Sequence, residues 1–254
     1  MIEALHFKDQ KTDKFWFVET LVCEMMVNYG KTGTTGKYKI KEFDNNQDCE
    51  KEALKLINSK KKKGYEEFVE FDRNNHYYFD DEEYGLNSLT SHPTFRKYFS
   101  DEIYYDCGDE EAPFGSDEGH DAFSELEESV RKKKKINFFD FPRVIIEEIW
   151  EMDYLTPDLE KTDEELKVQA KLNYNGLPGE QIILQSDQVI LAVTFGQAKI
   201  TGKIDKDLLE LALKSLNRMD KLNRLIWKRG KEEATYCIET MRKDLIKYKE
   251  DFKN

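Results

Sequence analysis

Apolar and polar positions near the start of the chain follow the pattern of β-strands. Residues 15–27 are rich in side chains that favour pleated, half-buried surfaces: Trp16, Val18, Leu21 and Val22. Residues 38–43 begin with Tyr38 and Ile40 in alternation with lysines, and they end at Phe43. This part of the chain is predicted to form strand, loop and strand.

Three glycines occupy the loop between the two predicted β segments. Gly30, Gly33 and Gly36 are expected to supply the positive-φ positions of tight turns. The loop does not fit the phosphate-binding pattern G-x-x-x-x-G-K-[ST], because Lys31 holds the first glycine position and Tyr38 the hydroxyl position. A strand also follows where that pattern requires a helix, so a nucleotide phosphate site is not predicted.

A helix is predicted after the second strand. Asn45 or Asn46 can cap its start, and Gly64 is placed to end it. Its inward face consists of Cys49, Ala53, Leu56 and Ile57. Residues 60–63 are four lysines, which suit the negative end of the helix dipole. The segment predicts a small antiparallel sheet with one helix packed across it.

This order of elements resembles the WGR domain, found in poly(ADP-ribose) polymerases and in a bacterial protein named as a molybdate metabolism regulator. Residues 15–65 carry the resemblance, and the naming tripeptide Trp-Gly-Arg falls on Tyr29, Gly30 and Lys31. The resemblance implies a nucleic-acid-binding module in which Tyr29 stacks on a sugar or base and Lys31 contacts phosphate. Lysine lacks the planar fork of arginine, which argues against tight, end-specific DNA binding.

The expected nucleic-acid-binding residues are Tyr29, Gly30, Lys31, Lys37, Lys39 and Lys41. Residues 31–63 hold 10 lysines against 5 acidic residues, which gives this region a local positive charge. Other interpretations stay open: Tyr29 as a half-buried aromatic that braces a turn, and the lysines as an ordinary solvated surface.

Helical periodicity dominates the remainder. Asn74, Asn75 and the acidic run at residues 80–83 predict a surface loop or linker, so the WGR-like domain is expected over residues 1–75 and a mostly helical domain over residues 76–254. Helices are predicted from Ser91-His92-Pro93 to Phe99, after caps at Ser116, Ser186 and Asp205, after Pro142, and over residues 232–249. Gly202 is expected to end the helix that Ser186 begins, and Ile149 to face inward in the helix after Pro142. The last helix is expected to carry the apolar residues Ile238, Met241, Leu245 and Tyr248 on its inner face. The predicted fold class is α+β, a small sheet with one helix followed by an all-α domain.

Several helical segments resemble a group of uncharacterised bacterial proteins, the YfeS-like group, that join a WGR domain to a helical partner. Ser91-His92-Pro93, residues 112–122 and Glu127-Glu128 carry this resemblance. It implies an architecture and no particular reaction.

Charge is distributed unevenly along the chain. The net charge is −12, yet residues 1–70 sum to zero while residues 71–130, with 3 basic and 17 acidic side chains, carry −14. A protein that held duplex DNA over its whole surface would be basic. Two hypotheses follow: a nucleic-acid-associated regulator that binds DNA or RNA through its N-terminal module, or an interaction or inhibitory module that meets a basic protein through the acidic segment 80–128.

Export, membrane insertion and disulfides are not predicted. The N-terminus has neither a basic start nor a long apolar stretch, and no apolar run reaches the roughly 18 residues of a membrane span. Cys23, Cys49, Cys107 and Cys237 are scattered, so reduced thiols in a cytoplasmic protein are expected.

One cluster of potential metal ligands stands out. Asp117, Glu118, His120 and Asp121 are interpreted as a helix start with solvated acids, with a Mg²⁺ or Ca²⁺ site as the alternative. Zinc is disfavoured because Cys107 and His120 lack a second ligand pair. With no nucleophile elbow, metalloprotease or dinucleotide motif present, neither enzymatic activity nor a cofactor is expected.

Overall fold

The first 67 residues form a five-stranded antiparallel sheet with one helix. In this computed structural model, which describes residues 1–227 and 236–252, the sheet order is β4-β3-β2-β1-β5. The strands are β1 (Ile2–Lys8), β2 (Asp13–Leu21), β3 (Glu24–Lys31), β4 (Lys37–Glu42) and β5 (Glu66–Glu67). The predicted β segment 15–27 is thus two strands joined at Val22, a residue with a φ of +52°. The first strand was not predicted.

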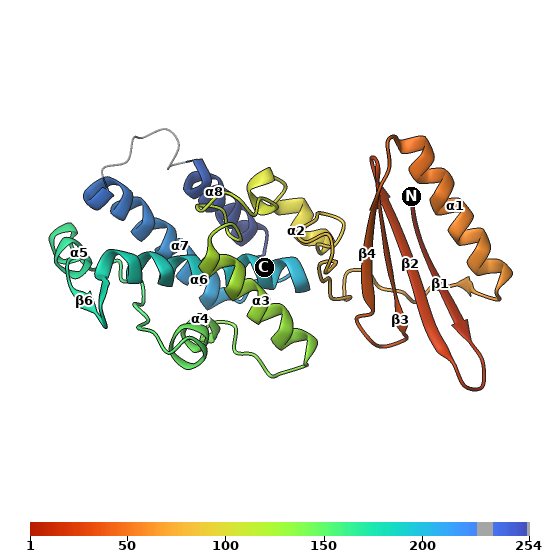
Figure 1. Ribbon diagram of the computed structural model, residues 1–254, viewed down its shortest axis with the longest axis horizontal. Helices are drawn as coiled ribbons and strands as arrows, with labels where there is room; N and C mark the ends of the chain where they lie inside the picture. Colours follow the sequence, from red (N-terminus) through yellow and green to blue (C-terminus); the bar gives the residue numbers. More distant parts are fainter. Residues whose placement is uncertain (228–235, 253–254) are drawn as a thin grey trace. The chain divides into compact units, whose positions relative to one another are not determined.

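Helix α1 (Asn46–Lys62) lies along one face of the sheet (Figure 1). The Asn45 side chain accepts a hydrogen bond from the Asp48 N–H, which confirms the predicted cap and stabilises the helix by about 1 kcal/mol. The core beneath the helix joins side chains of three strands to the predicted inner face of α1: Leu5, Trp16, Val18, Met25, Cys49, Ala53 and Ile57.

The other face of the sheet is covered by the chain that follows. The Phe71 ring lies against the rings of Phe15 and Phe17, with centroid separations of 5.8 and 4.9 Å. The buried Glu19 carboxylate accepts hydrogen bonds from Arg73 and Arg96. Residues 1–96 therefore form one compact unit and residues 97–254 another. The domain boundary expected near residue 75 stays a prediction.

Part of the acidic run 80–83 is not the solvated loop that the sequence suggests. Asp81 is buried, and its Oδ2 accepts a hydrogen bond of 2.8 Å from the Ile40 N–H at the edge of the sheet. The carboxylate satisfies an N–H of edge strand β4 that would otherwise lack a partner. Glu82 and Glu83 are exposed, as expected.

The second unit is built from helices. Its elements, with α2 crossing from the first unit, are α2 (Pro93–Tyr98), η1 (Glu102–Tyr104), α3 (Asp117–Arg131), α4 (Phe141–Arg143), η2 (Val144–Ile149), α5 (Asp163–Ala170), β6 (Asn173–Tyr174), β7 (Leu177–Pro178), α6 (Gly179–Thr201), α7 (Lys206–Leu222), η3 (Asn223–Trp227) and α8 (Tyr236–Asp251). Helix α6 passes through the middle of the unit (Figure 1) and is buried on all sides over most of its length. The predicted α+β class is confirmed, with a two-strand hairpin, β6–β7, added to the helices.

Most predicted helix ends agree with the structure. Ser116 caps α3, Asp205 caps α7, and Gly202 ends α6 in the left-handed region at a φ of +73°. Ser186 does not cap α6: the helix begins at Gly179, and the Ser186 hydroxyl donates to the Ile182 carbonyl inside the helix.

The helix predicted after Pro142 continues as a π-helical turn. Backbone hydrogen bonds between residues five apart shift the buried face of this helix. Ile145 and Ile146 are buried, while Ile149 is 42% exposed, contrary to the prediction. The predicted inner face of α8 is buried, and its predicted start at residue 232 lies outside the described residues.

Two further sequence expectations concern thiols and membranes. All four cysteines are free. Among the helices of residues 1–227 and 236–252, none is long and apolar enough to cross a bilayer.

Candidate nucleic-acid interface

Tyr29 lies in a row of side chains across the α1 face of the sheet. The register places it between Trp16 on β2 and Lys37 on β4, and residues opposite each other in antiparallel strands share a face. Trp16 is buried under α1, whereas Tyr29 is 41% exposed and Lys37 is exposed. The next row joins Lys14 to Lys31, both exposed. Tyr29 therefore stands among lysines from three strands.

The C-terminal end of α1 brings further lysines to this corner. Lys60 Nζ lies 5.6 Å from the Trp16 ring centroid and 5.1 Å from that of Tyr65. Burial lowers the pKa of Lys60, and the neighbouring charges of Lys63 and Lys14 lower it further. The pKa shift therefore reports lysines close enough to repel one another.

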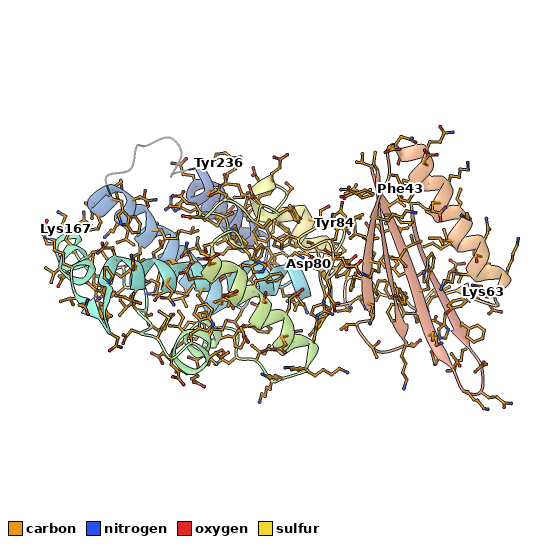
Figure 2. All side chains as sticks on the ribbon, in the orientation of Figure 1. Phe43, Lys63, Asp80, Tyr84, Lys167 and Tyr236 are labelled. Carbon is orange, nitrogen blue, oxygen red and sulfur yellow. The ribbon has the colours of Figure 1, made fainter. Side chains whose placement is uncertain are left out.

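We define the lysine patch as Lys14, Lys31, Lys37, Lys60 and Lys63. Within the described residues, none of these five has an ion-pair partner. Figure 2 shows Lys63 at the C-terminal end of α1 and Phe43 near the other end of the helix. A cluster of uncompensated ammonium groups around an exposed aromatic ring can bind phosphates and stack on a base or sugar.

The two other lysines of the predicted set are placed differently. Lys39 Nζ pairs with Asp81 Oδ1 at 3.0 Å and with Glu83 Oε2 at 3.1 Å, and these hydrogen bonds raise the pKa of Lys39. Lys41 Nζ lies over the Phe43 ring at 4.9 Å, toward the far end of α1. The structure thus brings Lys31 and Lys37 together with Tyr29 and leaves Lys39 and Lys41 outside the patch.

Gly30 and Gly36 allow strand β3 and the loop to meet. Gly36 has a φ of +70° and Gly33 a φ of +80°, as expected of turn glycines. Gly30 has no positive φ, contrary to expectation: it is needed for space, because a Cβ there would lie 2.8 Å from Gly36 Cα. The close approach of these two glycines fixes the loop that separates Lys31 from Lys37.

Asn28 holds this loop from the opposite face of the sheet. Its Nδ2 donates to the carbonyls of Thr35 and Lys37 at 3.0 and 3.2 Å, so its Oδ1 is left to accept from His76 Nε2 at 2.9 Å. Burial lowers the pKa of His76 to about 4, which keeps the ring neutral near pH 7. The position of Lys37 is therefore set by residues on both sides of the sheet.

The candidate metal ligands at residues 117–121 do not converge on a point. Ser116 caps α3 by accepting from the Gly119 N–H, and Asp117 and Glu118 lie in the first turn. Across the part of the chain that the structure describes, no group of three or more histidine, cysteine or acidic side chains is arranged to hold a metal ion.

Two comparisons with known proteins bear on this module. Residues 1–72 match the family model of the WGR domain. Protein YehF of Escherichia coli is 43% identical over 61 residues, which cover 24% of this chain and 22% of YehF. A crystal structure of a Bacteroides fragilis protein covers 41% of this chain and 31% of its own at 30% identity, with a TM-score of 0.27 that is too low to bear on the fold.

A comparison over nearly the whole chain extends the resemblance beyond the WGR domain. The uncharacterized protein YfeS of Escherichia coli is 41% identical over 242 residues, which cover 95% of this chain and 96% of YfeS. Both resemblances inferred from the sequence are thereby confirmed. The chain belongs to the same family as YfeS and carries a WGR domain at its N-terminus.

Proposed function

We propose that this protein is a nucleic-acid-associated regulatory protein that binds DNA or RNA through its WGR domain. The lysine patch would contact phosphates while Tyr29 stacks on a base or sugar. The observation that carries the proposal is the exposed Tyr29 ring beside lysines of three strands, in a patch of five lysines that have no ion-pair partner within the described residues. The proposal assigns no catalytic step to the protein.

The patch favours a nucleic-acid strand over an isolated anion. Lysines in adjacent strands are about 5 Å apart at the backbone, and the α1 lysines extend the charge along the corner of the sheet. A repeating chain of phosphates can meet several such charges at once. Because every cation is a lysine and the patch is small, we expect dissociation constants in the micromolar range at about 50 mM salt.

Fluorescence anisotropy with the full-length protein tests the proposal. Labelled single-stranded, nicked and intact duplex substrates should each be titrated at several salt concentrations. Lys31→Glu should weaken binding to all sequences about tenfold or more, because phosphate contacts carry affinity without reading bases. Lys51→Glu is the matched control, since Lys51 is an exposed lysine in the first half of α1, outside the patch.

Tyr29→Ala separates stacking from charge. It should lower affinity by about 1–3 kcal/mol, the usual contribution of one stacked base, and leave the dependence on salt concentration unchanged. Both Tyr29 and Lys31 are exposed, so thermal melting of the variants should stay close to that of the wild type.

Two results would reject the proposal. One is no binding to any of the three substrates at about 50 mM salt. The other is equal loss of affinity in Lys31→Glu and Lys51→Glu, which would show only an effect of net charge. The interaction-module hypothesis, with a basic protein bound through the acidic segment 80–128, would then take its place.

A further inference from the structure

The helical unit contains a cavity of about 770 Å³ beside the start of α3. Helices α3 and α6 and the chain after η2 contribute its walls. Four acidic residues line it, Glu110, Asp117, Glu118 and Asp121, while no lysine, arginine or histidine of the described chain does. Its volume lies in the range of small-molecule sites.

The acidic side chains of the cavity are not neutralised by the protein. Within the described residues, none of the four has an ion-pair partner. The N–H groups at the start of α3 favour Asp117 and Glu118, which lie in its first turn. Glu110 precedes the helix and Asp121 lies beyond the first turn, so the helix dipole does not account for the whole cluster.

Two glutamines of α6 provide an independent indication of a ligand. Gln185 and Gln188, 7% and 9% exposed, both line the cavity. Gln188 Nε2 donates to the Glu110 carbonyl at 3.2 Å, and Gln185 Nε2 points at the Met152 sulfur at 3.2 Å. Each contact uses the N–H side of the amide, because backbone carbonyls and thioethers can only accept. The two amide oxygens have no partner in the described chain.

Neither oxygen is among the fully buried polar atoms that lack a partner, so both reach solvent and can accept a hydrogen bond from a donor that enters the cavity. Together with the carboxylates, they make the cavity a set of acceptors without donors. Apolar side chains, among them Trp150, Met152 and Leu184, complete the wall. An aromatic ring can also attract a cation to its face.

We propose that this cavity binds a small organic cation that carries ammonium or guanidinium groups on an aliphatic chain. The acceptors would take the N–H groups, and the apolar wall would take the aliphatic part. A bare metal ion fits less well, because Mg²⁺ and Ca²⁺ require oxygen ligands that converge at about 2.0–2.6 Å. No such convergence of three or more acidic, histidine or cysteine side chains exists in residues 1–227 and 236–252.

Isothermal titration calorimetry of the full-length protein tests this site. Agmatine, spermidine, a short arginine-containing peptide and Mg²⁺ are the probes. We expect at least one of the three organic cations to bind about tenfold or more tightly than Mg²⁺. Tighter binding of the peptide would identify an arginine of a partner protein as the source of the cation, and tighter binding of agmatine or spermidine a free metabolite.

Variants locate the binding within the cavity. Asp117→Asn combined with Asp121→Asn should weaken binding about tenfold or more, because hydrogen bonds to charged groups are strong. Gln185→Met, which preserves volume and removes the acceptor, should also weaken it. Glu125→Gln is the matched control, because it removes one charge from α3 outside the cavity lining.

Three results would overturn the proposal: no binding of any organic cation at millimolar concentration, Mg²⁺ binding as tight as theirs, or equal weakening in the aspartate variant and Glu125→Gln. Asp117 and Asp121 are exposed, so the aspartate variant tests the site even if Gln185→Met fails to fold. Thermal melting should show that the aspartate variant is folded.

Discussion

Gly33 and Gly36 form a matched pair that tests how the loop beside Tyr29 is held. Both have a positive φ, +80° and +70°, so an added side chain is strained by the backbone at either position. They differ in space. A Cβ at Gly33 would have no other atom within 4 Å, whereas a Cβ at Gly36 would lie 2.7 Å from Phe15 Cζ and 2.8 Å from both Asn28 Nδ2 and the Tyr29 carbonyl oxygen.

The difference in space gives a difference in stability. A left-handed residue with a side chain costs about 1–2 kcal/mol, which is the whole expected effect of Gly33→Ala. Gly36→Ala adds an overpacking cost of about 1–3 kcal/mol, because the Phe15 ring and the Tyr29 backbone cannot both move away from the new methyl group. We therefore expect a loss of about 2–5 kcal/mol in the free energy of unfolding for Gly36→Ala, against about 1–2 kcal/mol for Gly33→Ala.

Hydrogen exchange followed by mass spectrometry can measure this difference in the full-length protein. Peptides that cover residues 13–42 report on the sheet directly, without interference from the helical unit. Gly36→Ala should also weaken nucleic-acid binding more than Gly33→Ala does, because it displaces Asn28 and the Tyr29 backbone. Equal loss of protection in the two variants would refute the argument that Gly36 is required for close packing.

Two further predictions concern the face of the sheet opposite to α1. Glu19→Gln should destabilise the sheet unit by about 3–5 kcal/mol, because it leaves Arg73 and Arg96 beside a neutral partner. Glu3→Gln removes only the surface ion pair with Lys61, so it should cost less than about 1 kcal/mol in the same hydrogen-exchange measurement. The folded-state pKa of His76, about 4, lies below the usual 6.5, so the unfolded chain takes up the proton first as the pH falls. The free energy of unfolding should therefore decrease by about 3 kcal/mol as pH drops from 6.5 through 4. If the urea midpoint of His76→Gln shows the same pH dependence as that of the wild type, this prediction is wrong.

The sequence predicts helices best where their signals are local. The caps at Ser116 and Asp205 lie next to the helices they begin, and the stop at Gly202 adjoins α6, so each is read from a few residues. The start of α6 has no such signal: Pro178 precedes it without a side-chain cap, and the helix is buried on all sides, so its apolar residues do not follow the one-sided periodicity that would show its length. Ser186, a good capping residue, therefore marked the wrong start.

The residues of the candidate interface also divide into those that the sequence indicates and those that only the fold brings together. Tyr29 and Lys31 follow from the WGR resemblance and Lys37 from its nearness in the sequence, but Lys14 joins them only through the pairing of β2 with β3. Lys60 joins through the packing of α1 on Trp16. Neither register nor helix packing can be read from residue spacing, and only the spacing Lys14-x-Trp16 indicates that Lys14 shares a face with the core.

Pairing, more than net charge, determines which lysines are available for the proposed binding of nucleic acid. Residues 1–70 carry equal numbers of lysines and acidic residues, yet Asp81 and Glu83, from beyond this segment, neutralise Lys39, while the patch has no acidic partner in the described chain. With about −0.9 in the logarithmic salt slope for each duplex phosphate contacted, five lysines set a limit of roughly −4.5. A steeper slope would mean that cations outside the patch contact the nucleic acid, and a slope near zero would leave Tyr29 alone to account for binding. The salt dependence of the wild-type protein therefore measures how much of the patch engages, independently of any variant.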